Sequence, residues 1–262
     1  NGYLRHLVLR YGCNTGELMV NLVTSYENTK VLEPIIKALL NQFPDITSIV
    51  NNINTRRADV AYGESEIILH GAPAIREKLG DITFEISANS FFQTNTEQAE
   101  KLFLVVQENA GLTGKEIVFD LFCGTGSISL FLARYAKDIY GFDVIKSAIE
   151  DATRNAVVNG IGNTKFQKVN LDTYFKKGRN LDNYPTPDLL ILDPPRSGIH
   201  KNMVKSLPKF GSRRIVYVSC NPTTQARDIM QLIHWGWKLQ SMTLVDMFPH
   251  TPHIETVALL TK

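Results

Sequence analysis

Cysteine is scarce in this 262-residue sequence, and its three copies lie far apart, at Cys13, Cys123 and Cys220. No two of them have the spacing of metal ligands, and a small odd number of cysteines does not build a disulfide framework. Such usage is typical of a reducing compartment, where thiols stay free. We therefore expect a cytoplasmic protein that is not held together by disulfides or by a cysteine-bound metal.

Long apolar runs and an excess of charge are also missing. No stretch approaches the roughly 20 apolar residues of a membrane-spanning helix, and the first residues form no secretory signal, so we expect no membrane partner. The net charge of +2 neither indicates nor excludes a polyanionic partner. Hydrophobic residues make up 44%, which indicates a globular chain with a substantial core. No Met opens the sequence, so we expect a piece of a longer or trimmed protein.

The first part of the sequence, residues 1–90, is predicted to be a small α+β domain. A helix is expected over Thr29–Phe43, where apolar residues recur at helical spacing. Strands are expected at Tyr3–Tyr11, Glu17–Ser25, Ile46–Asn52, Ile67–His70 and Thr83–Ile86, the first two joined as a hairpin. Nothing in this part points to catalysis.

The second part, residues 91–262, alternates between helices and strands. Helices are expected at Glu97–Ala110, Ser127–Tyr135, Ser147–Val158, Lys201–Leu207 and Thr224–Trp235. Strands are expected at Glu116–Leu121, Asp138–Phe142, Lys165–Val169, Asp188–Leu192, Arg214–Ser219, Met242–Val245 and Glu255–Leu260. Repeated βα units predict an α/β fold, a doubly wound parallel sheet with helices on both faces. A short loop joins the last two strands, so the final strand should run antiparallel.

A glycine-containing turn follows the first of these strands, and ligands of such sheets bind where the strands end. Gly124 and Gly126 let a ligand approach the backbone at a helix N-terminus, although ordinary tight turns look the same. Asp143 ends the next strand, where a carboxylate can accept hydrogen bonds from ribose hydroxyls or simply favour a helix N-terminus. Turn and carboxylate together favour a cofactor that carries a nucleoside. Asn170, after the third strand, could contact an adenine or close a turn.

Two prolines follow the fourth strand, in Asp193-Pro194-Pro195-Arg196. They hold the backbone extended and present Asp193 rigidly, either as part of a stiff turn or as an acceptor for the N–H of a base. Enzymes that methylate the amino groups of bases usually have an aromatic residue after this proline pair. Arg196 in that position counts against amino-group chemistry.

Cys220 ends the fifth strand and precedes a helix N-terminus, which can stabilise a thiolate. Most cysteines are buried apolar residues, but the other two are less well placed for catalysis. Glu255 opens the last strand, after a loop that contains His250 and His253. Two histidines and a glutamate in a proline-rich loop are weak grounds for a metal site, so we expect no metal. Taken alone, Glu255 could also be a solvated strand end.

Five motifs occur along the chain in this order: F-F-Q-T-N at 91–95, D-L-F-C-G-T-G at 120–126, D-P-P-R at 193–196, S-C-N-P at 219–222 and F-P-x-T-x-H-x-E at 248–255. Together they resemble the RNA uracil-C5 methyltransferases, which make 5-methyluridine in bacterial tRNA and large-subunit rRNA. The resemblance covers the whole chain, and the last three motifs are highly specific in combination. Family members usually begin with a small RNA-binding β-barrel, and some carry a cysteine-rich iron–sulfur segment. This sequence contains neither.

The resemblance implies that residues 91–262 form an S-adenosylmethionine-dependent methyltransferase domain. Residues 1–90 would then be the small central domain of that family. Cys220 is implied as the nucleophile and Glu255 as the base. The residues implied to line the S-adenosylmethionine site are Gln93, Phe122, Asp143 and Asp193, with Asp193 also near the uracil and Phe91 packed against the flipped base. RNA is the implied partner, large-subunit rRNA in preference to tRNA, and we expect a monomer.

The same residue types fit the chemistry independently. Carbon 5 of uracil is a poor nucleophile, and addition of a thiolate at carbon 6 places electron density on it. A base must then remove the carbon-5 proton, and the ring must leave the RNA stack. Two other functions stay open. The first is an N-methyltransferase acting on adenine or guanine, which would use Asp193 but need neither Cys220 nor Glu255. The second is an RNA-binding module that has lost catalysis.

Overall fold

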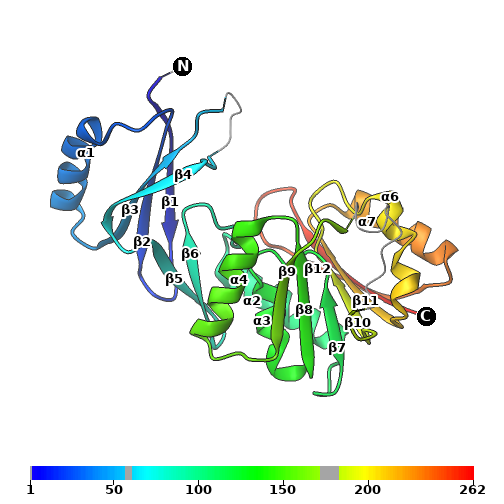
Figure 1. The fold of residues 1–262 in the computed structure, drawn as a ribbon. Coiled ribbons are helices and arrows are strands. Elements are labelled where there is room, and N and C mark those ends of the chain that lie inside the picture. The colour runs from blue at the N-terminus through cyan, green and yellow to red at the C-terminus, as the bar shows by residue number, and fades with distance from the viewer. Residues whose placement is uncertain (1, 57–60, 172–182) are drawn as a thin grey trace. The chain divides into compact units, whose positions relative to one another are not determined.

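Two units make up the chain, Asn1–Phe91 and Phe92–Lys262, in a computed structural model that describes residues 2–56, 61–171 and 183–262 (Figure 1). Each unit has its own sheet and its own apolar core. None of the helices in the described part of the chain has the length and apolarity of a membrane span.

A four-stranded sheet of order β1-β2-β3-β4 forms the first unit, with helix α1 (Thr29–Gln42) packed on one face. The strands are β1 (Leu4–Tyr11), β2 (Leu18–Thr24), β3 (Ile46–Ile53) and β4 (Ser65–Gly71), and a separate pair follows, β5 (Ala74–Leu79) and β6 (Ile82–Ser87). β1 and β2 form the expected hairpin, whereas β2 and β3 run parallel and are connected through α1. The predicted α+β content is found in this unit.

Strand β5 has no counterpart in the sequence prediction, and a buried charge is the reason. Ile75, Glu77 and Leu79 alternate on its buried face, so a carboxylate interrupts the apolar pattern that marks a half-buried strand. Burial is tolerated because Glu77 accepts the backbone N–H groups of Cys13 and Asn14, at 2.6 and 3.0 Å. The strand therefore supports the turn between β1 and β2.

A seven-stranded sheet of order β12-β13-β11-β10-β7-β8-β9 forms the second unit. Its strands are β7 (Ile117–Asp120), β8 (Asp138–Asp143), β9 (Thr164–Lys168), β10 (Leu189–Leu192), β11 (Arg214–Ser219), β12 (Lys238–Val245) and β13 (Glu255–Thr261). β7 to β11 pair in parallel, whereas β13 pairs antiparallel with both β11 and β12. The predicted doubly wound α/β fold and its antiparallel last strand are confirmed.

The helices of this unit are α2 (Thr96–Ala110), α3 (Ser127–Leu132), α4 (Lys146–Val158), α6 (Lys201–Val204) and α7 (Pro222–His234). Asn95 and Asn221 cap α2 and α7 with their side chains, which fixes where these two helices begin. The start of α7 follows Cys220 directly, so the cap also fixes the backbone beside that residue.

Three boundaries differ from the prediction by three residues or more. α3 ends at Leu132 rather than Tyr135, and a 3-10 turn (Ala133–Tyr135) follows it. α6 ends at Val204 rather than Leu207, because the ring of Pro208 would clash with the carbonyl four residues earlier, and a 3-10 turn follows instead. β12 begins at Lys238 rather than Met242, since it is an edge strand whose first residues are exposed and lack the expected apolar alternation.

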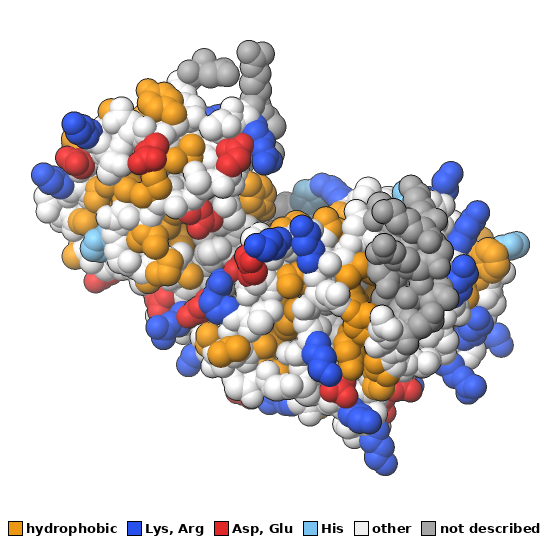
Figure 2. Space-filling view, viewed as in Figure 1, with side chains coloured by type: hydrophobic (Ala, Val, Ile, Leu, Met, Phe, Trp, Pro, Cys, Tyr) orange, Lys and Arg blue, Asp and Glu red, His pale blue; other side chains and the backbone are white. Residues whose placement is uncertain are grey.

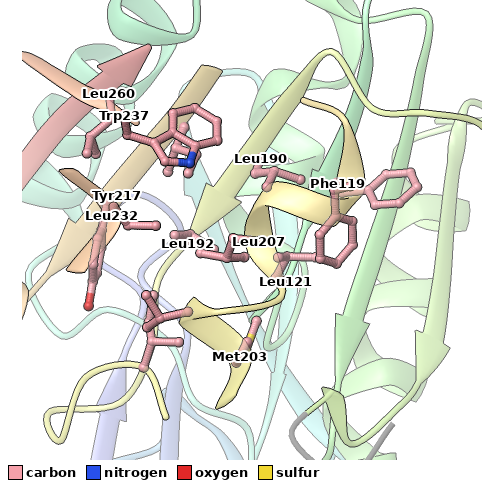
Figure 3. Packing of buried hydrophobic residues seen from close by; sticks show 14 of the residues in the cluster. Phe119, Leu121, Leu190, Leu192, Met203, Leu207, Tyr217, Leu232, Trp237 and Leu260 are labelled. Atoms are coloured by element: carbon pink, nitrogen blue, oxygen red, sulfur yellow. The ribbon is translucent and has the colours of Figure 1, made fainter. Parts of the chain in front are cut away.

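The core of the second unit lies where β7, β10 and β11 meet α6 and α7 (Figure 3). Phe119 of β7 is its aromatic centre, with ring centroids 5.4 Å from Phe142 and 6.1 Å from both Tyr184 and Phe210. Leu190 and Leu192 of β10 belong to the same cluster. The packing fixes the ends of these strands, which is where the predicted site residues stand.

We expect Phe119→Ala to destabilise the second unit strongly. Phe119 is fully buried, and truncation of a buried phenylalanine removes apolar contacts and leaves a cavity, at a cost of about 3–5 kcal/mol. Urea denaturation followed by near-ultraviolet circular dichroism measures the loss. Leu104→Ala on α2 is the control, because Leu104 is half exposed and should change stability by less than about 1 kcal/mol. Equal midpoints for the two variants would contradict the assignment of this core.

Candidate active site

The carboxyl ends of the parallel strands bring most of the predicted site residues to one edge of the seven-stranded sheet. Asp143 ends β8, while Asp193 and Cys220 directly follow β10 and β11. β13 runs the opposite way, so its first residue, Glu255, lies at the same edge. Strand direction alone therefore places these four residues together.

Cys220 and Glu255 stand on neighbouring strands. Ser219 is the register partner of Thr256, and antiparallel pairing makes the adjoining residues, Cys220 and Glu255, neighbours as well. The hydroxyl of Thr256 donates to the carbonyl of Ser219 at 3.0 Å, and the side-chain amide of Gln225 on α7 donates to the carbonyl of Thr256 at 3.3 Å. These buried contacts hold the register in which thiol and carboxyl face one edge.

Glu255 is buried, with 8% of its surface exposed, so it is not a solvated strand end. Burial raises the pKa of its carboxyl to about 7, because an ionised carboxylate loses its hydration there. A group with such a pKa exists in both its charged and neutral forms at neutral pH. That property suits a general base.

Two further carboxyls share this environment. Burial raises the pKa of Asp193 well above its usual range, and the nearby Glu255 and Asp120 raise it further. Asp120, at the end of β7, has its pKa raised to about 7, mainly by burial. One Asp120 oxygen accepts the hydroxyl of Ser129 at 2.7 Å, and the other has no partner among the described residues. Sequence reasoning did not single out Asp120, although an acid inside an apolar strand was the available signal.

The following helix, expected to be able to stabilise a Cys220 thiolate, does not leave this thiol with a lowered pKa. The pKa of Cys220 is raised by burial and then by Glu255 and Asp193, while Arg196 lowers it. The free N–H groups of α7 are already used, because the side chain of Asn221 accepts those of the next helical residues. Cys220 therefore rests as a thiol, half-buried at the sheet edge.

The other two cysteines differ from Cys220 in exposure and place. Cys123 is buried in the turn after β7, and burial raises its pKa well above its usual value. Cys13 is exposed in the turn between β1 and β2 of the first unit. Cys220 is thus the one described thiol that stands at the strand-end edge while reaching the surface.

The turn after β7 is tied to Asp143 through the backbone. The two Asp143 oxygens accept the N–H groups of Gly124 and Ile145, at 3.0 and 2.8 Å. Gly124 and Gly126 have φ values of 53° and 80°, in the region that only glycine enters readily. A side chain at Gly126 would also press on Ala152, 3.0 Å away. The carboxylate is therefore held against a turn that side chains cannot fill.

The remaining residues predicted to contact the cofactor lie on several segments. Phe122 is half-buried, and its ring packs against the core of the second unit. Gln93 is half-buried just before α2, and Asn95 in the same segment donates to the carbonyl of Met247 at 3.2 Å. Asn170, after β9, is also half-buried. Phe91 is exposed at the end of the first unit.

A buried network holds the loop that follows Asp193-Pro-Pro. Asp228 of α7 is fully buried and accepts the backbone N–H of Ile199 and the hydroxyl of Tyr217, each at 2.8 Å. Gly198 has a φ of 78°, and a Cβ there would lie 2.6 Å from Asp228. Sequence reasoning missed Asp228, although an acid on the apolar face of an amphipathic helix was a usable signal.

Metal-ligating residues do not gather in the part of the chain that the structure describes: no group of three or more His, Cys, Asp or Glu side chains is placed to hold an ion. His250 has a φ of 68°, unusual for a residue other than glycine, in the loop before β13. His253, further along that loop, lies 3.4 Å from a guanidinium nitrogen of Arg196.

Comparison with known proteins connects this site to a family. A family model described as tRNA (uracil-5-)-methyltransferase matches residues 73–262. The chain belongs to this family. An RNA methyltransferase of Chlorobaculum tepidum is 43% identical over 98% of this chain and 53% of its own length. One of Enterococcus faecalis is 44% identical over 100% of this chain and 57% of its own. The chain thus spans about half the length of the curated relatives it matches.

Solved structures agree with that membership of the uracil-5 methyltransferase family. The tRNA (uracil-54, C5)-methyltransferase of Pyrococcus abyssi, in complex with S-adenosyl-L-homocysteine, matches with a TM-score of 0.83 and 38% identity, over 100% of this chain and 60% of that one. Trm5b of the same organism matches with a TM-score of 0.61 and 14% identity, over 98% and 74%, which shows likeness of fold alone. The family and the methyltransferase fold implied by the motifs are confirmed.

The raised pKa of Glu255 predicts how stability depends on pH. Between its ordinary value of 4.5 and about 7, the folded chain keeps a proton on Glu255 that the unfolded chain has lost. Stability should therefore fall as pH rises through this range, by about 3 kcal/mol from this group. Glu255→Gln cannot ionise, so it should match the parent near pH 4 and exceed it by that amount near pH 8. Urea denaturation across this range measures both.

The control for this measurement is Glu108→Gln, on the exposed face of α2. Its pH profile should follow that of the parent. If Glu255→Gln also follows the parent profile, burial does not disfavour the charged form of the Glu255 carboxyl, contrary to what the structure indicates.

Proposed function

We propose that this chain is the catalytic part of an S-adenosylmethionine-dependent enzyme that methylates carbon 5 of a uridine in RNA through a Cys220 adduct. One observation carries the proposal: a half-buried thiol and a buried carboxyl are neighbours at the edge where the parallel strands end. An N-methyltransferase would need neither group. Membership of the uracil-5 family, and the uracil-54 activity named for the solved relative, support the same reaction.

The turn after β7 fits S-adenosylmethionine. Asp143 is held by Gly124 and Ile145, and its oxygens keep further lone pairs that can accept the ribose hydroxyls. Val144 and Ile145 beside it are exposed apolar side chains, which suit the flat face of an adenine. The solved relative contains S-adenosyl-L-homocysteine, which supports this assignment.

The other contacts of the cofactor are proposed from the motifs. Phe122 belongs to the turn after β7, and Gln93 lies in the segment before α2. Asp193 lies between that turn and Cys220 along the order of strands β7, β10 and β11. The unpaired oxygen of Asp120 is a further polar atom at this end of β7. When bound, the cofactor supplies the methyl group.

The first step is the addition of Cys220 to carbon 6 of the uracil. The sulfur forms the new bond, its proton leaves to water, and the π electrons of the C5–C6 bond move toward carbon 5 and the oxygen on carbon 4. The pKa of Asp193 is raised well above its usual range, which favours the neutral form of its carboxyl. A neutral carboxyl can donate a hydrogen bond to that oxygen and accept one from the ring N–H, so it stabilises the charge that develops.

The last step belongs to Glu255. After carbon 5 has taken the methyl group, the charged form of Glu255 removes the carbon-5 proton. The electrons of that C–H bond restore the C5–C6 double bond, and the C6–S bond breaks with its electron pair returning to Cys220. A pKa of about 7 leaves enough charged Glu255 at neutral pH for this transfer.

Two RNA classes are candidates for the substrate. Large-subunit rRNA is our proposal, and it rests on the motif resemblance. tRNA is the second candidate, because the family description and the solved relative both name it. Mass spectrometry of tRNA and rRNA from cells that lack the gene separates them by which RNA loses 5-methyluridine. A monomeric, cytoplasmic enzyme remains a prediction from the sequence.

Asp143→Ala should weaken the binding of S-adenosylmethionine by about 1–3 kcal/mol, the scale of lost hydrogen bonds to a charged group. Isothermal titration calorimetry in the absence of RNA measures the affinity. Asp138→Ala is a matched control, because Asp138 begins the same strand at the opposite edge of the sheet. Unchanged affinity in Asp143→Ala, or an equal loss in Asp138→Ala, would remove Asp143 from the site.

Cys220→Ala and Glu255→Gln should fail at different steps. Without the thiol, turnover should be lost and no covalent RNA complex should form. Without the base, addition and methyl transfer should proceed, but the methylated adduct should stay attached to Cys220 because its proton cannot leave. Denaturing gels should show a protein–RNA band for Glu255→Gln that depends on both S-adenosylmethionine and Cys220.

RNA that contains 5-fluorouridine provides the control for this experiment. Fluorine cannot leave as a cation, so the unmutated protein should be trapped in the same way. The N-methyltransferase and the inactive binding module predict no band in either case. The adduct mechanism would be rejected if the Cys220→Ala variant were active, or if target RNA that contains 5-fluorouridine never crosslinked to the protein.

A further inference from the structure

Arg196 and His253 form a pair of exposed basic side chains beside the candidate active site. A guanidinium nitrogen of Arg196 lies 3.4 Å from Nδ1 of His253. Neither side chain contacts a carboxylate anywhere in the described ranges. Arg56, Arg154 and Arg227 differ, since each pairs with a carboxylate. Because a guanidinium only donates, Arg196 donates to Nδ1 of His253, and the ring nitrogen Nε2 and the other N–H groups of Arg196 are left to bind an anion.

The pair stands at the edge where the uracil must enter. Arg196 ends the Asp193-Pro-Pro-Arg segment, and its carbonyl accepts the side-chain N–H of Asn221, the residue after Cys220, at 3.1 Å. His253 lies two residues before Glu255 in the loop that leads into β13. The charge of Arg196 also reaches the sulfur, since it lowers the pKa of Cys220.

Both basic residues sit on backbone that is already held in place. Besides Asn221, the hydroxyl of Thr224 bonds to the Arg196 carbonyl, at 3.3 Å. Arg227 donates to the carbonyl of Ser197 at 3.0 Å, so the loop beyond Arg196 is fixed to α7 as well. The backbone N–H of His253 donates to the hydroxyl of Thr251 at 3.2 Å. A pre-organised pair of this kind loses little entropy when it binds an anion.

A broad basic surface does not explain these two residues. On the face drawn in Figure 2, Lys and Arg side chains are spread over the second unit rather than gathered into one patch. The net charge of the chain is only +2. The overall charge of the chain therefore does not explain anion binding at this edge.

We propose that Arg196 and His253 bind a phosphodiester adjacent to the target uridine, at the rim of the Cys220 site. The inference rests on the proposed function, which brings a uridine to Cys220 with its backbone phosphates attached. Arg196 offers a planar fork of N–H donors to two phosphate oxygens, and His253 offers a ring nitrogen from the other side. The contact carries no base specificity and sets the position of the nucleotide.

The first test compares Arg196→Met and His253→Asn with Arg213→Met. Arg213 is a matched control, exposed at the opposite edge of the same sheet, just before β11. Filter binding to oligouridylate over a range of salt concentrations should show a three- to tenfold weaker affinity for Arg196→Met and a salt slope reduced by about one. His253→Asn should also weaken binding, and Arg213→Met should match the parent. The affinity for S-adenosylmethionine should stay unchanged in all three variants.

The second test places the phosphate. Hairpin RNAs carry one 5-fluorouridine and a single neutral methylphosphonate linkage, on its 5′ or its 3′ side. One of these linkages should slow adduct formation by the parent and should have no added effect in Arg196→Met. If the linkage slows adduct formation equally in the parent and in Arg196→Met, the proposal is overturned.

Two other results would also overturn it. Weaker binding of S-adenosylmethionine by Arg196→Met would assign the pair to the carboxylate of the cofactor. An equal loss of RNA affinity in Arg213→Met would show a general effect of charge. The proposed function fails separately, if the parent protein forms no 5-fluorouridine adduct at all. In that case the oligouridylate titration still measures the Arg196 contact, because RNA binding does not require catalysis.

Discussion

The reversed direction of β13 is the constraint on which the site depends. β13 lies between β11 and β12 and runs antiparallel to both, so it begins at the edge where the parallel strands finish. Glu255 thereby becomes the neighbour of Cys220, although 35 positions separate the two in sequence numbering. A parallel strand in this place would bring its last residue to the edge instead. The thiol and the carboxyl would then lie at opposite ends of the sheet.

Burial is the shared cause of three raised pKa values at this edge. Asp120, Asp193 and Glu255 each have a raised pKa, and burial is the largest cause for each. Since the ionisation of one carboxyl raises the pKa of its neighbours, the group does not carry its full negative charge at once. In the proposed reaction, a carboxyl in its neutral form can donate a hydrogen bond, and a neighbouring carboxyl in its charged form can act as a base. The same environment raises the pKa of the Cys220 thiol.

Helix α7 holds these groups in position through polar side chains on its first turns. Asn221 caps the helix and holds the Arg196 carbonyl, Gln225 supports the register of β11 and β13, and Asp228 holds the loop beyond Arg196. Gln225 and Asp228 are completely buried, and buried polar groups with satisfied hydrogen bonds strongly favour one arrangement. One helix therefore links the Asp193 loop, the Cys220 turn and the strand that carries Glu255.

The sequence by itself determined the alternation of helices and strands, the turn at Gly124 and the strand-end positions of Asp143, Asp193 and Cys220. Hydrophobic periodicity and turn residues are local signals, so they can be read without knowing what lies opposite. The same local reading failed at β5, where the buried Glu77 breaks the apolar pattern.

Only the tertiary structure decided which distant residues meet and which polar groups lose water. The order of the strands made Cys220 and Glu255 neighbours, and the loop after β10 brought Arg196 to His253. Burial raised the pKa of Glu255. Asp228 came to hold the loop at Ile199, which is far from it in the sequence. Desolvation and pairing depend on everything packed around a residue, and a local pattern does not contain that information.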